Sequence, residues 1–327
     1  MKFRAQGWLA GLAGVFLVGC GGGGGGGGDD DTTVDGSVTT TDGGGNQPDA
    51  YVMPPNSKMI RLIEAQYSIP AGQEFYQCTR LDAAEQLDIL KLIPVAPNGT
   101  HHTVFATDPS KGTVGTSRSD CGAIGLDWKP LFASGVGSPA LTMPPGVSLR
   151  IASGNQMVLN LHLYNASGAT ITGTAALDAV VSTDPSTLEP AGVPFVGPPP
   201  AGQFRIPSNV MMTDRCKVSR DTQFFAVFPH MHQKGRHIKI WAETGGGQQV
   251  VWDKDYDFND QSFGSFTPIQ LTTGDTIHVA CEWDPSAANV ALGDSSDQEM
   301  CFAISYVYPP VATQGPFCTC SIPGLGC

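Results

Sequence analysis

The chain has 327 residues, a formal net charge of −12 and a sequence pI near 4.8. At roughly 150 residues per domain, this length predicts two domains. The acidic balance argues against a nucleic-acid partner, because phosphate binding depends on concentrated positive charge and no Lys/Arg cluster interrupts the globular part of the chain.

The first 20 residues have the order of a secretory signal. Lys2 and Arg4 are followed by an apolar run too short to span a bilayer and by small residues before Cys20. The ending LVGC resembles the lipobox of bacterial lipoproteins, which predicts a signal peptide over 1–20 and lipidation of Cys20; a plain signal peptide is the alternative. The protein is therefore expected to be exported and lipid-anchored to a bacterial membrane, and Gly21 favours the outer membrane.

Residues 21–55 contain a run of glycines followed by Asp, Thr and Gly, with almost no apolar side chain. Such a segment cannot bury enough surface to offset the loss of chain entropy. It is expected to be a flexible, acidic tether.

From residue 56 onward, short runs of alternating apolar and polar residues are separated by Gly, Pro, Asn and Asp. In the first half these runs predict strands over 75–81, 101–107, 147–153, 156–165 and 171–181. The exception is LDAAEQLDILKL, residues 81–92, whose spacing predicts a helix.

A stretch rich in Pro and Gly, residues 182–204, predicts a connection between domains. Strand-like runs then resume over 222–232, 236–244, 248–258, 275–283 and 300–309. The predicted fold class is all-β, with two tandem antiparallel β-sandwich, jelly-roll-like domains at 56–190 and 191–327.

Apart from Cys20, the chain has an even set of cysteines: Cys78, Cys121, Cys216, Cys281, Cys301, Cys318, Cys320 and Cys327. In an exported chain such a set predicts disulfides, although counting alone fixes no pairing. The closing CTC could be a soft metal site, but bridging is the favoured use in an oxidising compartment.

Histidine is rare, with seven residues in the chain, yet four of them form two close pairs. His230 and His232 in FPHMHQKG share one face of an extended strand, because side chains alternate between faces. His101 and His102 are adjacent, so both reach one metal only where the backbone bends, and Asn98-Gly99 supplies a turn signal just upstream.

The remaining candidates are weaker when each is considered alone. Asn160, His162 and Tyr164 share a face of an alternating strand, where a single histidine is more often structural than a ligand. His237 and His278 are expected to take no part. Met300 shares its face with Phe302, Ile304, Tyr306 and Tyr308, and a strand methionine is normally core filler.

Taken in order, four motifs resemble the copper type II, ascorbate-dependent monooxygenases, the family of dopamine β-hydroxylase and peptidylglycine α-hydroxylating monooxygenase. They are HH at 101–102, LHLYN around His162, PHMHQKG as His-x-His-x-x-Gly, and SSDQEMC around Met300. The likeness spans roughly residues 58 to 310, and MCFAISYVYP looks closer to the dopamine branch. It implies two jelly-roll-like domains that each hold one copper across an open cleft.

The resemblance also implies the ligands. His101, His102 and His162 match the copper that stores and passes an electron, and His230, His232 and Met300 match the catalytic copper where O2 binds. Imidazole suits both oxidation states of copper, whereas a thioether favours Cu(I). The implied cofactors are two coppers per chain, with ascorbate or a similar reductant as co-substrate.

Two disulfides are implied in the same way: Cys78 with Cys121, and Cys281 with Cys301 beside Met300. Cys216 would then bond one of the remaining three, Cys318, Cys320 or Cys327. A Cys318 to Cys320 bridge would close a very short, strained loop, so Cys327 is expected in one of the two bonds.

The sequence departs from the peptidylglycine branch where that branch binds its substrate's carboxylate. That branch has an Arg two residues before the first His of His-x-His, and an Asn and a Tyr two and four residues after the Met. The corresponding residues in this sequence are Phe228, Phe302 and Ile304. The pocket beside that copper is therefore expected to be apolar, and the substrate neutral or aromatic.

The expected function is hydroxylation of a C–H bond of a small organic molecule with O2 and an external reductant. One alternative is a non-catalytic copper-binding or storage surface lipoprotein, and another is a structural β-sandwich adhesin. The expected partners are the substrate, O2 and the reductant, with membrane contact only through the lipid anchor, and the chain is expected to be a monomer.

Overall fold

The computed structural model describes residues 52–119, 121, 122, 125, 127–135, 137–200, 202, 204–293, 295, 297–313 and 317–321. Within these ranges the chain is built of strands and turns, with one 3-10 turn at Pro285–Ala287. No helix there is long and apolar enough to cross a membrane. The predicted signal peptide with Cys20, residues 21–51 of the tether, and Cys327 lie outside the described residues.

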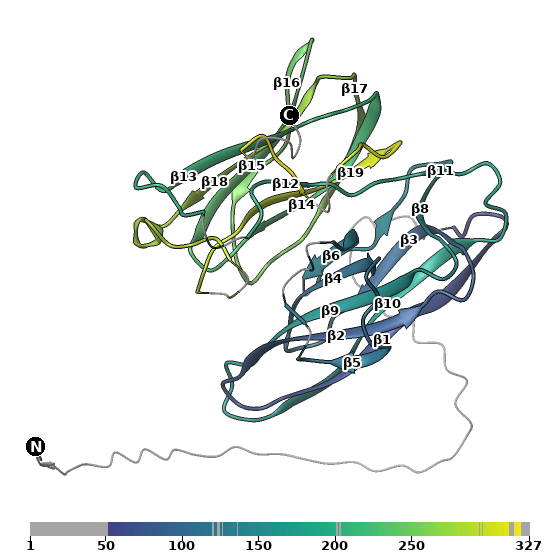
Figure 1. Ribbon diagram of the computed structural model, residues 1–327, viewed down its shortest axis with the longest axis horizontal. Coiled ribbons are helices and arrows are strands. Elements are labelled where there is room, and N and C mark those ends of the chain that lie inside the picture. The colour runs from purple at the N-terminus through teal and green to yellow at the C-terminus, as the bar shows by residue number, and fades with distance from the viewer. Residues whose placement is uncertain are drawn as a thin grey trace, which may run out of the picture. The chain divides into compact units, whose positions relative to one another are not determined.

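Two sheets form the first sandwich body (Figure 1). One has the order β1 (Ser57–Ile69), β10 (Ile171–Ser182), β3 (Leu87–Val95), β8 (Val147–Ile151) and β11 (Glu189–Pro190), with β7 (Leu141–Thr142) paired to β3. The other has the order β5 (Gly115–Ser117), β2 (Glu74–Asp82), β9 (Gln156–Tyr164), β4 (Thr100–Asp108) and β6 (Lys129–Gly135).

Two further sheets form the second body. One has the order β17 (Gly264–Leu271), β14 (Thr222–Met231), β19 (Cys301–Tyr308), β12 (Phe195–Val196) and β20 (Phe317–Cys318). The other has the order β13 (Met211–Lys217), β18 (Thr276–Trp283), β15 (Gly235–Thr244) and β16 (Gly247–Asp255). The predicted all-β class with two sandwich bodies is confirmed.

The helix predicted over residues 81–92 is wrong. β2 ends at Asp82, and after a short connection β3 begins at Leu87. Strand β3 is hydrogen-bonded on one side to β10 and on the other to β8, and Ile89 and Leu92 are fully buried. Pairing on both edges satisfies the backbone and outweighs the small helix preference of Ala, Glu, Gln and Leu.

The predicted connection over 182–204 also adds a strand to each body. β11 pairs in parallel with β8 of the first body, and β12 pairs with β19 and β20 of the second. The connection is thereby fixed at both of its ends.

Strand β19 contributes to two cores at once. Phe302, Ile304 and Tyr306, together with the preceding Met300, belong to a buried cluster that continues into the first body. Cys301, Ala303 and Val307 point the other way, into the core between the two sheets of the second body. This alternation is the one predicted from the sequence, and it places Met300 where the two bodies meet.

Three disulfides join described cysteines: Cys78–Cys121, Cys281–Cys301 and Cys216–Cys318. The first two are the pairs implied by the resemblance, and Cys320 is disulfide-bonded as well. This use of cysteine indicates an oxidising compartment, extracellular or periplasmic.

Candidate metal centre

A β-bulge lets His101 and His102 approach the same point. In the pairing of β4 with β9, Thr100 lies opposite Leu163, but His102 lies opposite His162, so His101 is the extra residue. A bulge re-aims side chains in this way. The predicted turn precedes it, with Gly99 at φ +93°.

The three imidazoles converge through their Nδ1 atoms. These atoms are 3.2 Å apart in His101 and His102, and 3.4 Å apart in His102 and His162. Three nitrogens bound about 2.0 Å from one ion at tetrahedral angles would lie about 3.3 Å from one another. The observed spacing therefore fits a single metal ion held by three histidines.

Burial keeps the imidazoles of His101 and His102 neutral. Desolvation, helped by the neighbouring histidines, lowers the pKa of His101 to about 4 and lowers the pKa of His102 well below its ordinary value. A neutral imidazole has the free lone pair that a metal ion requires.

His162 is oriented from behind by two residues of β2. Its Nε2 donates a hydrogen bond to Oε1 of Glu74 at 2.7 Å, and the ring of Tyr76 stacks on it with centroids 4.6 Å apart. With the proton on Nε2, the Nδ1 lone pair is directed into the cluster. Sequence reasoning missed both residues, although they alternate with Cys78 in EFYQC.

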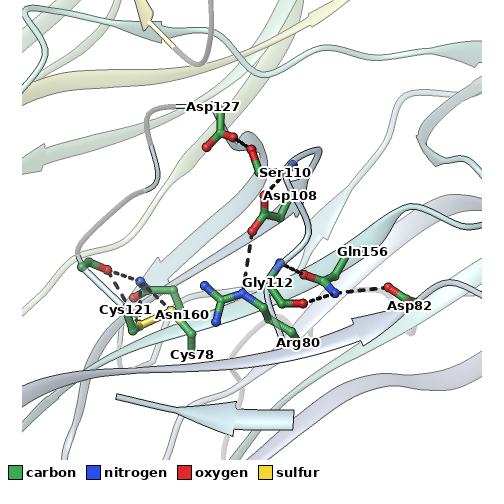
Figure 2. Close-up of polar contacts among 11 residues, drawn as sticks. Cys78, Arg80, Asp82, Asp108, Ser110, Gly112, Cys121, Asp127, Gln156 and Asn160 are labelled. Atoms are coloured by element: carbon green, nitrogen blue, oxygen red, sulfur yellow. Dashed lines mark hydrogen bonds and ion pairs between the residues drawn. A yellow bond between two sulfur atoms is a disulfide. The ribbon is translucent and has the colours of Figure 1, made fainter. Parts of the chain in front are cut away.

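Asn160 lies on the same face of β9 as His162 but makes different contacts. Its amide donates to the Gly122 carbonyl at 2.5 Å and lies 3.6 Å from the sulfurs of Cys78 and Cys121 (Figure 2). Cys121 and Gly122 are thus held against the sheet face that carries His162. Figure 2 shows further polar pairs: Arg80 with Asp108, Gln156 with Gly112 and Asp82, and Ser110 with Asp127.

Glu299, next to Met300, fixes the turn that follows His232. Its fully buried carboxylate accepts hydrogen bonds from the backbone N–H of His232 at 3.1 Å, that of Lys234 at 2.8 Å and Nε1 of Trp283 at 2.9 Å. Sequence reasoning missed this role too, and the only signal was the position of Glu299 beside Met300.

Gly235 is required by close packing in the same turn. Its N–H donates to the His232 carbonyl at 3.0 Å, and a Cβ there would lie 2.9 Å from Cβ of Met231 and 2.8 Å from the Tyr256 ring. This accounts for the glycine of His-x-His-x-x-Gly.

His230 and His232 are held by their Nδ1 atoms, with rings 5.3 Å apart. Nδ1 of His230 donates to Oε1 of Gln261 at 2.9 Å, and Nδ1 of His232 donates to the Gln298 carbonyl at 3.1 Å. Nε2 of His232 is buried without a hydrogen-bond partner among the described residues. Burial lowers the pKa of His230 to about 3 and that of His232 to about 4, so a neutral donor nitrogen is available for a metal.

A cavity of about 30 Å³ lies beside these groups. It is lined by His102, His230, Met300, Phe228, Phe302, Ile304, Phe195, Ala133, Val104 and Thr103. Met300 therefore faces the same space as His230, and the three residues expected to form the substrate pocket are on its wall. The volume holds a water-sized molecule, whereas pockets for organic ligands enclose several hundred Å³.

Among the residues that the structure describes, the open cleft implied by the resemblance is not observed. The rings of His102 and His230 are 5.1 Å apart, and the rings of His101 and Phe258 are 3.9 Å apart. The physical reason is the apolar outer face of β14 and β19, where Phe228 and Phe302 bury themselves in the cluster shared with the first body.

The other two histidines lie outside the cluster, as expected. His237 contacts Asp253 at 3.1 Å, and His278 stacks on Trp241 with centroids 4.7 Å apart. Their contacts are thus with residues outside the histidine cluster.

Comparison with solved structures gives two distant likenesses. A structure of PNGF-II is 8% identical with a TM-score of 0.35; the match covers 79% of this chain and 65% of that one, just under two thirds. A protein described as secreted, from Parabacteroides distasonis, is 9% identical with a TM-score of 0.17, covering 80% and 85%. Neither supports a functional argument.

Comparison with protein families is more informative. The matched residues, 191–324, contain His230, His232 and Met300 together with the strands that carry them. This part of the chain matches the family described as copper type II ascorbate-dependent monooxygenase, C-terminal domain.

Proposed function

We propose that the protein is a copper monooxygenase that hydroxylates a C–H bond of a small organic molecule with O2 and an external electron donor. The observation that carries the proposal is the meeting of two ligand sets. In the first set, Nδ1 of His102 lies 3.2 Å from that of His101 and 3.4 Å from that of His162. In the second set, His230 and Met300 line a common cavity, and the ring of His232 lies 5.3 Å from that of His230. The family match over 191–324 supports it.

The two ligand sets differ in the oxidation state of copper that their side chains favour. Copper supplies one-electron redox chemistry when bound, and two ions can store the two electrons taken from the donor. An all-imidazole set suits both oxidation states, whereas the Met300 thioether favours the reduced ion.

The wall residues indicate the substrate class. Phe228, Phe302 and Ile304 offer neither charge nor hydrogen bonds, so we expect a neutral or aromatic substrate. The test compares the turnover of a neutral aromatic compound with the turnover of a peptide that ends in a free carboxylate. A preference for the peptide would contradict this assignment.

Metal analysis tests the proposal most directly. The wild type is expected to bind two coppers, and Met300→Ala and His162→Ala are each expected to weaken one site and abolish coupled hydroxylation. Exposed Met59 and His237, which pairs with Asp253, provide matched controls, Met59→Ala and His237→Ala, which should keep both coppers. Full coupling in Met300→Ala would refute the proposal.

A non-catalytic copper-storage protein is the second candidate, favoured by the small cavity of about 30 Å³. Oxygen uptake with ascorbate and candidate substrates separates the two, because a storage protein binds copper without forming a hydroxylated product.

Lipid anchoring at Cys20 is part of the proposal, and the disulfides agree with export. Cys20→Ser is expected to move the protein from the membrane fraction to the soluble fraction. Unchanged membrane association would exclude this anchor.

A further inference from the structure

The loop between β16 and β17, residues 256–263, contacts ligands of both sets. The ring of Phe258 lies 3.9 Å from that of His101, measured between centroids. Gln261 accepts a hydrogen bond from Nδ1 of His230 at 2.9 Å. One short segment of the second body thereby contacts both candidate copper sites.

The main chain of Gln261 binds the first body. Its carbonyl accepts hydrogen bonds from the N–H of Gly135 at 3.2 Å and the hydroxyl of Ser138 at 2.8 Å. Gly135 is paired with His102 across β4 and β6. Gln261 is thus bound next to His102 through its backbone and to His230 through its side chain.

The loop is itself held in place by hydrogen bonds. The Tyr256 hydroxyl donates to the Met231 carbonyl at 2.6 Å, and Nε2 of Gln261 donates to the Phe258 carbonyl at 3.1 Å. Because Nε2 is used in this way, Oε1 is the atom presented to His230. Gln261 is 2% exposed, so each of these polar atoms depends on its protein partner.

We propose that Gln261 is a positioning residue that latches the two ligand sets together, and that its contact with Gly135 and Ser138 opens when an organic substrate enters. The inference rests on the proposed function. The cavity encloses about 30 Å³ between Ala133 of the first body and Phe228 and Phe302 of the second. Enlarging it means moving these walls apart, which breaks the Gln261 contact.

Gly135→Ala tests the latch without altering a ligand. A Cβ at this position would lie 2.7 Å from the Gln261 carbonyl oxygen, so the contact must loosen. Gly168→Ala is the matched control, because a Cβ there meets nothing within 4 Å. Ser138→Ala is the milder variant: it removes the hydroxyl that bonds Gln261 and keeps the glycine.

Two readouts are independent of turnover. In copper-free full-length protein, amide hydrogen exchange at 133–138 and 256–263 is expected to rise about tenfold in Gly135→Ala, whose Cβ displaces the Gln261 carbonyl. The rise should be smaller in Ser138→Ala, because the N–H of Gly135 still donates to that carbonyl. In the copper(II)-loaded protein, both ions should remain bound while the dipolar coupling between them in the electron paramagnetic resonance spectrum falls.

The outcomes separate the latch from the proposed function. The latch is overturned if Gly135→Ala and Ser138→Ala both show the same hydrogen exchange and the same dipolar coupling as Gly168→Ala. This holds even if the enzyme is active. A wild type that binds no copper would overturn the proposed function, while the exchange experiment would still decide whether Gln261 joins the two bodies.

Discussion

Glu74 lies behind the three-histidine set rather than within it. Glu74→Gln keeps a hydrogen-bond acceptor for Nε2 of His162 but removes the charge that increases the ligand's basicity. We expect copper affinity at this site to fall about tenfold, the lower end for changes to a residue that hydrogen-bonds a metal ligand. A chelator competition measures it, with Glu64→Gln, which loses only an exposed pair with Arg61, as the control. Equal affinities would remove this role.

The buried imidazoles predict a pH dependence of stability in the copper-free protein. The folded state lowers the pKa of His101, His230 and His232 to about 4, 3 and 4, below the ordinary 6.5, so unfolding takes up protons between these values. Their stabilising contribution is therefore complete above pH 6.5 and is lost as the pH falls.

Urea unfolding at pH 7 and pH 5 measures this effect. The free energy of unfolding should approach a slope of about 1.4 kcal/mol per pH unit for each imidazole below pH 6.5. His230→Gln should reduce that slope because one titrating group is gone. An unchanged slope in this variant would mean that His230 does not contribute.

The turn before β4 decides whether His101 reaches its neighbours. Gly99 has φ +93°, and a Cβ would lie 2.6 Å from Ile69, so Gly99→Ala should lower the unfolding free energy by about 1–3 kcal/mol and weaken copper binding. Gly72→Ala, at φ +68° in open space, carries only the backbone strain. Equal losses of stability in the two variants would show that the Ile69 contact is unimportant.

Alternation of side chains was sufficient to predict most strands and the faces they bury. It correctly put His230 on the same strand face as His232, and Met300 on the same face as Phe302. The reason is that local backbone geometry makes every second side chain of a strand point to the same face. The pattern failed over 81–92, where pairing with β10 and β8 decides the structure. The bulge at His101 required more than alternation, and only the motif order indicated that both adjacent histidines serve one site.

Gln261 shows why part of the site could not be predicted. It lies in a loop with no periodic pattern, and its role depends on Gly135 and Ser138, more than 120 positions away along the chain. Contacts of this kind exist only once the two bodies have met. Glu74 and Glu299, in contrast, lie near recognisable motif residues.

At the scale of the whole molecule, the net charge of −12 affects the electron donor. Ascorbate is an anion, so repulsion should slow its encounter with the protein at low salt. We expect its rate of copper reduction to rise between about 0.01 and 0.15 M ionic strength as the charges are screened. Neutral hydroquinone should show no such rise. Rates for ascorbate that do not change with salt would show that the surface near the entry point is not acidic.

The double use of β19 has a practical consequence for anyone who wishes to express the matched segment alone. A fragment of 191–327 would bring Phe228, Phe302, Ile304 and Tyr306 into water, since their burial depends on a cluster that continues into the preceding sandwich. An aromatic patch of this kind promotes self-association. A soluble fragment would need polar replacements there, and these would change the wall of the cavity beside Met300.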